Sequence, residues 1–167
     1  MASGESIVTA TSPYENYVID AARDGVVEVV RVYLSEGGCV NLRDCDTKGT
    51  LLQWSCSYGR LGTAALLLQR GADVEAVDNE KWTCLHWACH SGHSGATDTA
   101  RMLLENGAHL DAGDSQNWTP MHVACNVGRT DTVRFLLDVG CDAAARTDKN
   151  LTALHIACES GFTDTAR

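Results

Sequence analysis

Thr119-Pro120-Met121-His122-Val123-Ala124-Cys125 is the stretch that decides the fold, because the chain repeats its pattern. Two further copies are Thr83-Cys84-Leu85-His86-Trp87-Ala88-Cys89 and Thr152-Ala153-Leu154-His155-Ile156-Ala157-Cys158, and a weaker copy is Thr50-Leu51-Leu52-Gln53-Trp54-Ser55-Cys56. Successive copies begin 33, 36 and 33 residues apart. Self-similarity at a period of this size indicates a repeat architecture, in which each unit buries its apolar face against its neighbours.

Each copy opens a unit that reads as a turn, a short helix, a tight glycine turn and a longer helix. Apolar residues three and four apart, such as Ala64, Leu67 and Leu68, put one face of a helix inward. Glycines recur at the predicted helix ends, where they suit a left-handed cap; these are Gly59, Gly92, Gly128 and Gly161, and Gly71, Gly107 and Gly140. The sequence therefore predicts an all-α solenoid of stacked helix-turn-helix pairs.

The period and the motif together resemble the ankyrin repeat. The resemblance covers about residues 14–167 and implies an ankyrin-repeat solenoid with projecting β-turn fingers, which binds proteins and is not an enzyme. Residues 1–13 are expected to form a flexible N-terminal tail. The predicted units are 14–46, which has the features of an N-terminal cap, then 47–79, 80–115, 116–148 and a truncated 149–167. Because the last unit stops within its second helix, we expect the natural protein to continue.

Composition and charge exclude several classes of partner. The 167 residues carry a net charge of −9, which opposes a nucleic-acid backbone and an anionic membrane. No stretch approaches the roughly 18 apolar residues of a spanning helix, and the N-terminal segment lacks the features of a signal peptide. We expect a cytoplasmic or nuclear protein with a protein partner of unknown identity, no cofactor and no small-molecule substrate.

The eight cysteines do not read as a disulfide framework. Cys56, Cys89, Cys125 and Cys158 occupy one repeat position and form a column. Neighbouring helices pack about 8–10 Å apart, whereas a disulfide needs Cα atoms within roughly 7 Å, so the column is expected to be reduced and buried. The other four cysteines, Cys39, Cys45, Cys84 and Cys141, fall in or beside predicted turns. The set fits a reducing compartment.

A Cys/His cluster in the third unit suggests a metal or redox site as an alternative. Its members are Cys84, His86, Cys89, His90 and His93. The resemblance implies that His86 hydrogen-bonds around its turn, as its equivalents would, and Cys89 belongs to the buried column. Too few ligands then remain for zinc, so no metal site is predicted. A redox sensor needs an exposed thiol of low pKa, and the first candidates are Cys84, Cys39 and Cys141.

Other recurrent residues are assigned to structure. Leu52, Leu85, Met121 and Leu154 are expected to carry the interfaces between units, and Trp54 and Trp87 to pack in the core. Acid–base pairs three residues apart, such as Asp98 and Arg101, mark a solvated helix face. Thr97, Thr130 and Thr163 are predicted N-caps. Three extra residues around Ser94-Gly95-Ala96 predict a longer loop, with or without a role in binding.

The residues left over point to a binding surface. In the family that the chain resembles, partners contact the turn tips and the exposed end of each first helix. On this sequence we expect these partner-binding residues to be Tyr58, Lys81, Trp82, His90, Asn117, Trp118 and Asn126. Trp82 and Trp118 are equally well explained as covers over the base of their turns. No catalytic residues are predicted. A second hypothesis makes the array the regulatory or substrate-recruiting region of a larger enzyme, channel or ubiquitin-ligase adaptor.

Overall fold

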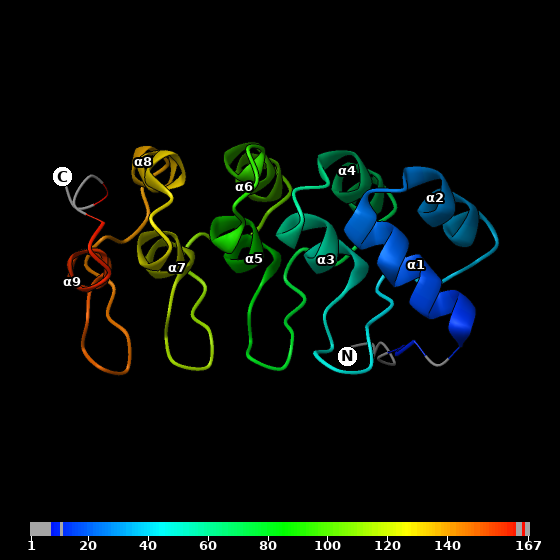
Figure 1. Cartoon of the computed structure of the whole chain (residues 1–167), viewed down its shortest axis with the longest axis horizontal. Coiled ribbons are helices and arrows are strands. Elements are labelled where there is room, and N and C mark those ends of the chain that lie inside the picture. The colour runs from blue at the N-terminus through cyan, green and yellow to red at the C-terminus, as the bar shows by residue number, and fades with distance from the viewer. Residues whose placement is uncertain (1–7, 11, 163–164, 166–167) are drawn as a thin grey trace.

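Helices in two rows make up the fold. The structure, a computed structural model, describes residues 8–10, 12–162 and 165. Its helices are α1 (Pro13–Asp24), α2 (Val27–Ser35), α3 (Leu51–Ser57), α4 (Leu61–Gln69), α5 (Cys84–His90), α6 (Ala96–Glu105), α7 (Pro120–Asn126), α8 (Thr130–Asp138) and α9 (Ala153–Glu159). The odd-numbered helices form the inner row and the even-numbered helices the outer row (Figure 1). The predicted all-α repeat solenoid is confirmed.

Long loops project from the inner row on one side, and we call them fingers (Figure 1). The first to fourth fingers are residues 36–50, 70–83, 106–119 and 139–152. Their tips have left-handed backbone at Lys48, Lys81, Asn117 and Asn150, with φ between 58° and 61°. Neighbouring fingers are hydrogen-bonded through their backbones: Asn79 donates to the Thr47 carbonyl at 2.9 Å, and Ser115 to the Glu80 carbonyl at 3.0 Å. The fingers therefore form one continuous surface.

The threonine that opens each motif caps an inner helix. In α5, the Thr83 hydroxyl lies 2.9 Å from His86 Nδ1, and the Thr83 backbone N–H donates to the same nitrogen at 3.2 Å. Gln53 takes the place of this histidine in α3, where its Oε1 accepts the Thr50 N–H at 2.7 Å. This reciprocal pairing satisfies N–H groups that the first turn of a helix leaves open.

The same side chains join each unit to the next finger. Gln53 Nε2 donates to the Trp82 carbonyl at 2.7 Å, and His86 Nε2 lies 2.9 Å from the Trp118 carbonyl. His122 Nε2 lies 3.3 Å from the Leu151 carbonyl. Because Nδ1 of His86 accepts a backbone N–H, its Nε2 carries the proton and donates. The hydrogen bond around the turn that the family resemblance implies for this histidine is present.

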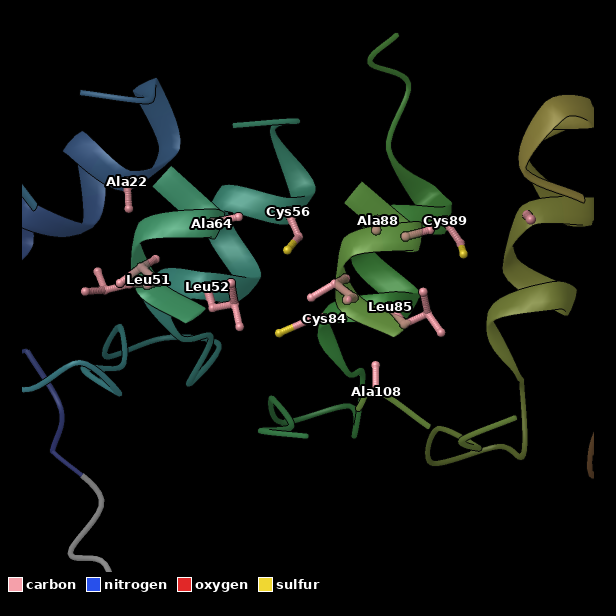
Figure 2. Close-up of a cluster of buried hydrophobic side chains, with 14 of the residues drawn as sticks. Ala22, Leu51, Leu52, Cys56, Ala64, Cys84, Leu85, Ala88, Cys89 and Ala108 are labelled. Carbon is pink, nitrogen blue, oxygen red and sulfur yellow. The ribbon is translucent and has the colours of Figure 1, made fainter. Parts of the chain in front are cut away.

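The apolar interfaces between units follow the predicted column except at its end. Leu52, Leu85 and Met121 are buried, and Figure 2 shows Leu52 of α3 and Leu85 of α5 within the core. Leu154 was expected to match them, but 56% of it is exposed. Among the described residues, α9 has an inner-row neighbour on only one side, namely α7. Cys158 is exposed for the same reason, so its predicted burial is also wrong.

The N-terminal segment departs from the expected flexible tail. Ala10 N donates to the Arg43 carbonyl at 2.7 Å, and Arg43 N to the Val8 carbonyl at 2.9 Å. The Ser12 side chain caps α1, which begins at Pro13. Residues 8–10, 12 and 13 are therefore part of the fold, since their backbone groups find partners on the first finger and α1. Residues 1–7 and 11 lie outside the described residues.

The predicted threonine caps of the outer helices are wrong. The N-cap of α6 is Gly95 and that of α8 is Arg129, so Thr97 and Thr130 lie inside their helices. Thr97 Oγ1 instead lies 3.1 Å from Thr132 Oγ1 of the next unit. The prediction for Thr163 falls outside the described residues.

The predictions for the glycine caps and for the acid–base pairs of the outer helices hold only in part. Gly59 and Gly128 are left-handed as predicted, whereas Gly92 is not, because the chain becomes extended at Ser91 and enters the longer loop. Glu28 and Arg31 form an acid–base pair at 3.3 Å. The Arg101 guanidinium, by contrast, lies 4.5 Å from the centre of the Phe135 ring.

Burial at the unit interfaces predicts the cost of removing side chains there. Leu85→Ala should lower the free energy of unfolding by about 2–5 kcal/mol, because it leaves a cavity in a close-packed core. The matched Leu154→Ala variant should cost less than about 0.5 kcal/mol, since its side chain is mostly in solvent. Urea unfolding followed by circular dichroism measures both, and equal losses would show that unit interfaces do not stabilise the array.

The buried histidine predicts a pH dependence of stability. The pKa of His86 is lowered, and burial is the largest cause of this shift. The hydrogen bond to the Trp118 carbonyl raises the pKa and so opposes the effect of burial. As the pH falls below about 6.5, this histidine therefore takes up a proton more readily in the unfolded chain than in the folded protein. The free energy of unfolding is consequently highest above that pH and falls on acidification. His86→Gln, which copies Gln53, should reduce the fall in unfolding free energy between pH 7.5 and 5.5. The exposed His109→Gln is the control, and an equal change in both variants would contradict the assignment.

Candidate functional site: a tryptophan-lined cavity between fingers

A cavity of about 400 Å³ lies between the second and third fingers. Its walls include Trp82, Trp87 and Trp118, and its carboxylates are Asp78, Glu80 and Asp114. Asn126, the last residue of α7, lines it as well. This volume falls within the range of sites that hold small molecules or single side chains.

Two aspartates hold the indole rings of the cavity. Asp78 Oδ2 accepts the Trp87 indole N–H at 2.9 Å, and Asp114 Oδ2 accepts that of Trp82 at 3.0 Å. Each aspartate also organises its own finger: Asp78 Oδ1 accepts the backbone N–H groups of Glu80 and Trp82, both at 2.9 Å. Each of these two neighbouring rings is thus positioned by its own hydrogen bond, Trp87 by an aspartate of the second finger and Trp82 by an aspartate of the third.

Aromatic contacts fix the ring of Trp82 further. It meets Trp87 edge-to-face at 4.8 Å between ring centroids and stacks on His86 at 6.0 Å. His90 lies 5.6 Å from Trp82, and burial, followed by the positive charge of Arg129, lowers the pKa of His90. Trp82 therefore covers part of its own turn and also lines the cavity, because an indole offers an apolar body and a polar edge.

The structure brings together some of the predicted site residues and separates others. Trp82, Trp118 and Asn126 meet at the cavity, with His90 against Trp82. Lys81 and Asn117 lie exposed at the finger tips, where Asn117 Nδ2 donates to Asp148 Oδ1 at 2.6 Å. Tyr58 lies elsewhere, stacked on His93 of the longer loop with ring centroids 6.4 Å apart.

Sequence reasoning missed several residues of the cavity, among them Trp87, Asp78, Glu80 and Asp114. Trp87 was assigned to core packing, and it does pack against the core, but it is half-buried and lines the cavity. Asp78 and Asp114 were not singled out. Their signal is an aspartate five residues before the motif threonine in two consecutive units, 36 residues apart.

The longer loop of the third unit borders a second cavity. This cavity has a volume of about 300 Å³ and lies between residues 91–97 and the 128–132 segment of the next unit. Gly59 approaches the loop closely, since a Cβ there would lie 2.7 Å from His93 Cβ. The loop is therefore packed against the preceding unit.

The Cys/His residues of the third unit do not converge on a metal position. Both ring nitrogens of His86 are engaged with Thr83 and the Trp118 carbonyl. Within the described part of the chain, no three His, Cys, Asp or Glu side chains lie close enough to share a metal ion. None of the helices in this described part of the chain has the length and hydropathy needed to cross a membrane.

Cys84 is not the accessible thiol that the sequence suggested. It is fully buried as the first residue of α5, and Figure 2 shows its side chain with that of Cys56 between α3 and α5. Burial raises the pKa of Cys84 well above its usual value, and the neighbouring Cys56 adds to the effect. Burial also raises the pKa of Cys125 to about 11. Burial, followed by the negative charges of Asp111 and Asp142, raises the pKa of Cys141. Cys84 and Cys141 thus lack the properties of a reactive thiol.

These environments predict an order of thiol modification. In the native protein at pH 7.5, iodoacetamide should label the exposed Cys45 and Cys158 first, because the reagent reaches them without unfolding. Cys56, Cys84 and Cys89 should be labelled only in denaturant. Peptide mass spectrometry measures the order, and labelling of native Cys84 as fast as Cys158 would contradict the burial described above.

Comparison with known proteins agrees with the repeat architecture. The family model described as ankyrin repeats (3 copies) matches residues 18–114 and 94–167. Over 80 residues the chain is 38% identical to palmitoyltransferase Hip14 of Drosophila melanogaster, covering 47% of this chain and 12% of that protein. It is 35% identical over 68 residues to palmitoyltransferase ZDHHC13 of Homo sapiens, covering 41% of this chain and 11% of that protein. It is 30% identical over 97 residues to the putative E3 ubiquitin-protein ligase XBAT31 of Arabidopsis thaliana, covering 56% of this chain and 21% of that protein. The chain thus spans about a tenth to a fifth of the length of these relatives.

Proposed function

Since the chain belongs to the ankyrin repeat family, whose repeats are a protein-interaction module, we propose that it holds a protein partner on its fingers and inner-helix ends. The contact residues of this proposal are Tyr58, Lys81, Trp82, His90, Asn117, Trp118 and Asn126, joined by Trp87. The observation that carries the proposal is the cavity between the second and third fingers, with its three tryptophans.

The tryptophans have the properties of interface anchors. Aromatic side chains that fill or line pockets dominate the energetics of many protein interfaces. Trp82 and Trp87 are already held by Asp114 and Asp78, so a partner need not immobilise them on binding. Preorganisation of this kind lowers the entropic cost of association. The finger tips beside the cavity supply exposed polar groups, which suit the rim of an interface.

The free cysteines indicate the cellular compartment in which the proposed complex would form. All eight are free thiols, and four of them are buried. We propose that the protein works in the cytoplasm or nucleus, where thiols stay reduced. Ankyrin repeats are not catalytic units, and the proposal gives this chain a partner but no substrate, cofactor or membrane contact of its own.

A second candidate function is recruitment within a larger protein. It is favoured by the relatives, which are named as palmitoyltransferases and a putative ubiquitin ligase and are far longer than this chain. In that case the finger surface would hold a substrate or regulator for a catalytic region elsewhere. Both functions use the same surface.

A paired capture experiment tests the proposed surface. The Trp82→Ala/Trp118→Ala double variant should retain its partner at least about tenfold less well than the wild type, because aromatic anchors carry much of the binding free energy. Quantitative mass spectrometry of proteins captured from a lysate measures the retention.

The matched control is Leu137→Ala, which removes an exposed apolar side chain from the outer row. It should leave capture unchanged, and circular dichroism should show that both variants are folded. An identical set of captured proteins for the double variant and the wild type would refute the finger surface.

A further inference from the structure

We propose that the cavity between the second and third fingers binds one cationic side chain from a basic segment of the protein partner. The inference rests on the proposed function and names the chemistry of the occupant. It depends on the charge of the cavity, on the indole rings that line it and on a cation–indole contact elsewhere in this chain.

The cavity concentrates negative charge without a cation of its own. Asp78, Glu80 and Asp114 line it, and no lysine or arginine among the residues that the structure describes does. The ion pairs found among residues 8–10, 12–162 and 165 are Arg23 with Asp20 and Arg31 with Glu28, both in the first unit. The three carboxylates therefore face the cavity uncompensated by an ion pair, in a chain of net charge −9. An anion would be repelled there, whereas a cation would be attracted.

The indole rings favour a cation over an apolar group. A cation above an indole face is attracted by the negative face of the ring, and tryptophan is the strongest of the aromatic residues in this respect. Asp78 is already buried, and Asp78 and Asp114 accept hydrogen bonds from the fingers and indoles, whereas Glu80 is exposed. A neutral apolar side chain would take the Glu80 carboxylate out of water and return no charge interaction, which is unfavourable. Aromatic walls with acidic groups around them thus select a positively charged side chain.

The first two units already contain such a contact. The Arg23 guanidinium of α1 lies 3.9 Å from the centre of the Trp54 ring. Trp87 is the equivalent of Trp54 one unit later, and Ser57 aligns with Arg23. The preceding unit instead places the Trp54 ring beside Trp87, with 6.2 Å between ring centroids. An indole of this column can therefore take a guanidinium on its face, and in the described part of the chain no cation of the protein is placed in this way on Trp87, which lines the acidic cavity.

Small cationic probes test the proposal directly. We would titrate ¹⁵N-labelled protein with the N-acetyl amides of lysine, trimethyllysine and arginine, and with the neutral analogue of trimethyllysine that has carbon in place of the quaternary nitrogen. The indole N–H signals of Trp82, Trp87 and Trp118 should shift, and that of Trp54, already covered by Arg23, should not. At least one cation should bind about tenfold more tightly than the neutral analogue. The three cationic probes then show whether lysine, methylated lysine or arginine is preferred.

A charge-removing pair of variants provides the control. Glu80→Gln removes one negative charge from the cavity at an exposed side chain. It should weaken binding of the cationic probes several-fold and leave the affinity for the neutral analogue unchanged. Glu105→Gln makes the same change at the end of α6, away from the cavity, and should have no effect.

Two results would overturn the inference: equal affinity for the neutral analogue, or no shift of the three indole signals with any cation. Either result, combined with loss of partner capture in the Trp82→Ala/Trp118→Ala variant, would leave the finger surface in place and reject only its cationic occupant. Failure of both experiments would reject the proposed function as well.

Discussion

One hydrogen bond between consecutive units supports the rest of this structure. The third helical residue of each motif, Gln53, His86 or His122, reaches from an inner helix to a backbone carbonyl of the next finger. The same side chain pairs with the threonine that caps its own helix. It therefore fixes a helix start and a neighbouring finger at once. Because its polar atoms are buried, losing either partner would leave an unsatisfied group in the core.

The candidate site depends on this bond. The carbonyl that Gln53 holds belongs to Trp82, and the carbonyl that His86 holds belongs to Trp118, so the backbone of both tryptophans is anchored from the preceding unit. The aspartates Asp78 and Asp114 then set the ring positions of Trp87 and Trp82. Fold and surface thus share the same residues, which is why a surface cavity can have a defined shape in so small an array.

Much of the fold and part of the candidate site could be predicted from the sequence, because residues at equivalent positions of the repeats have equivalent surroundings. Aligning the motif copies identified the helix pairs, and the family resemblance implied the hydrogen bond of His86 and placed Trp82, Trp118 and Asn126 on one surface, where the structure brings them together. The failures have physical causes. Leu154 and Cys158 follow the buried pattern but lie where no further helix pair packs on α9 within the described residues. Cys84 replaces the motif proline and was placed at a turn, yet the first helical position points into the interface between α3 and α5.

The sequence by itself determined the period, the helix pairs and most of the buried face of each helix, because these follow from contacts that recur at equivalent positions of every unit. Tertiary structure alone decided the cavity. Its walls come from α5, the end of α7 and two successive fingers, and Trp87 and Asp114 are 27 residues apart in the chain. Periodicity says which positions face a neighbour. It does not say which side chains converge there, since ring orientation depends on the hydrogen bonds that Asp78 and Asp114 complete.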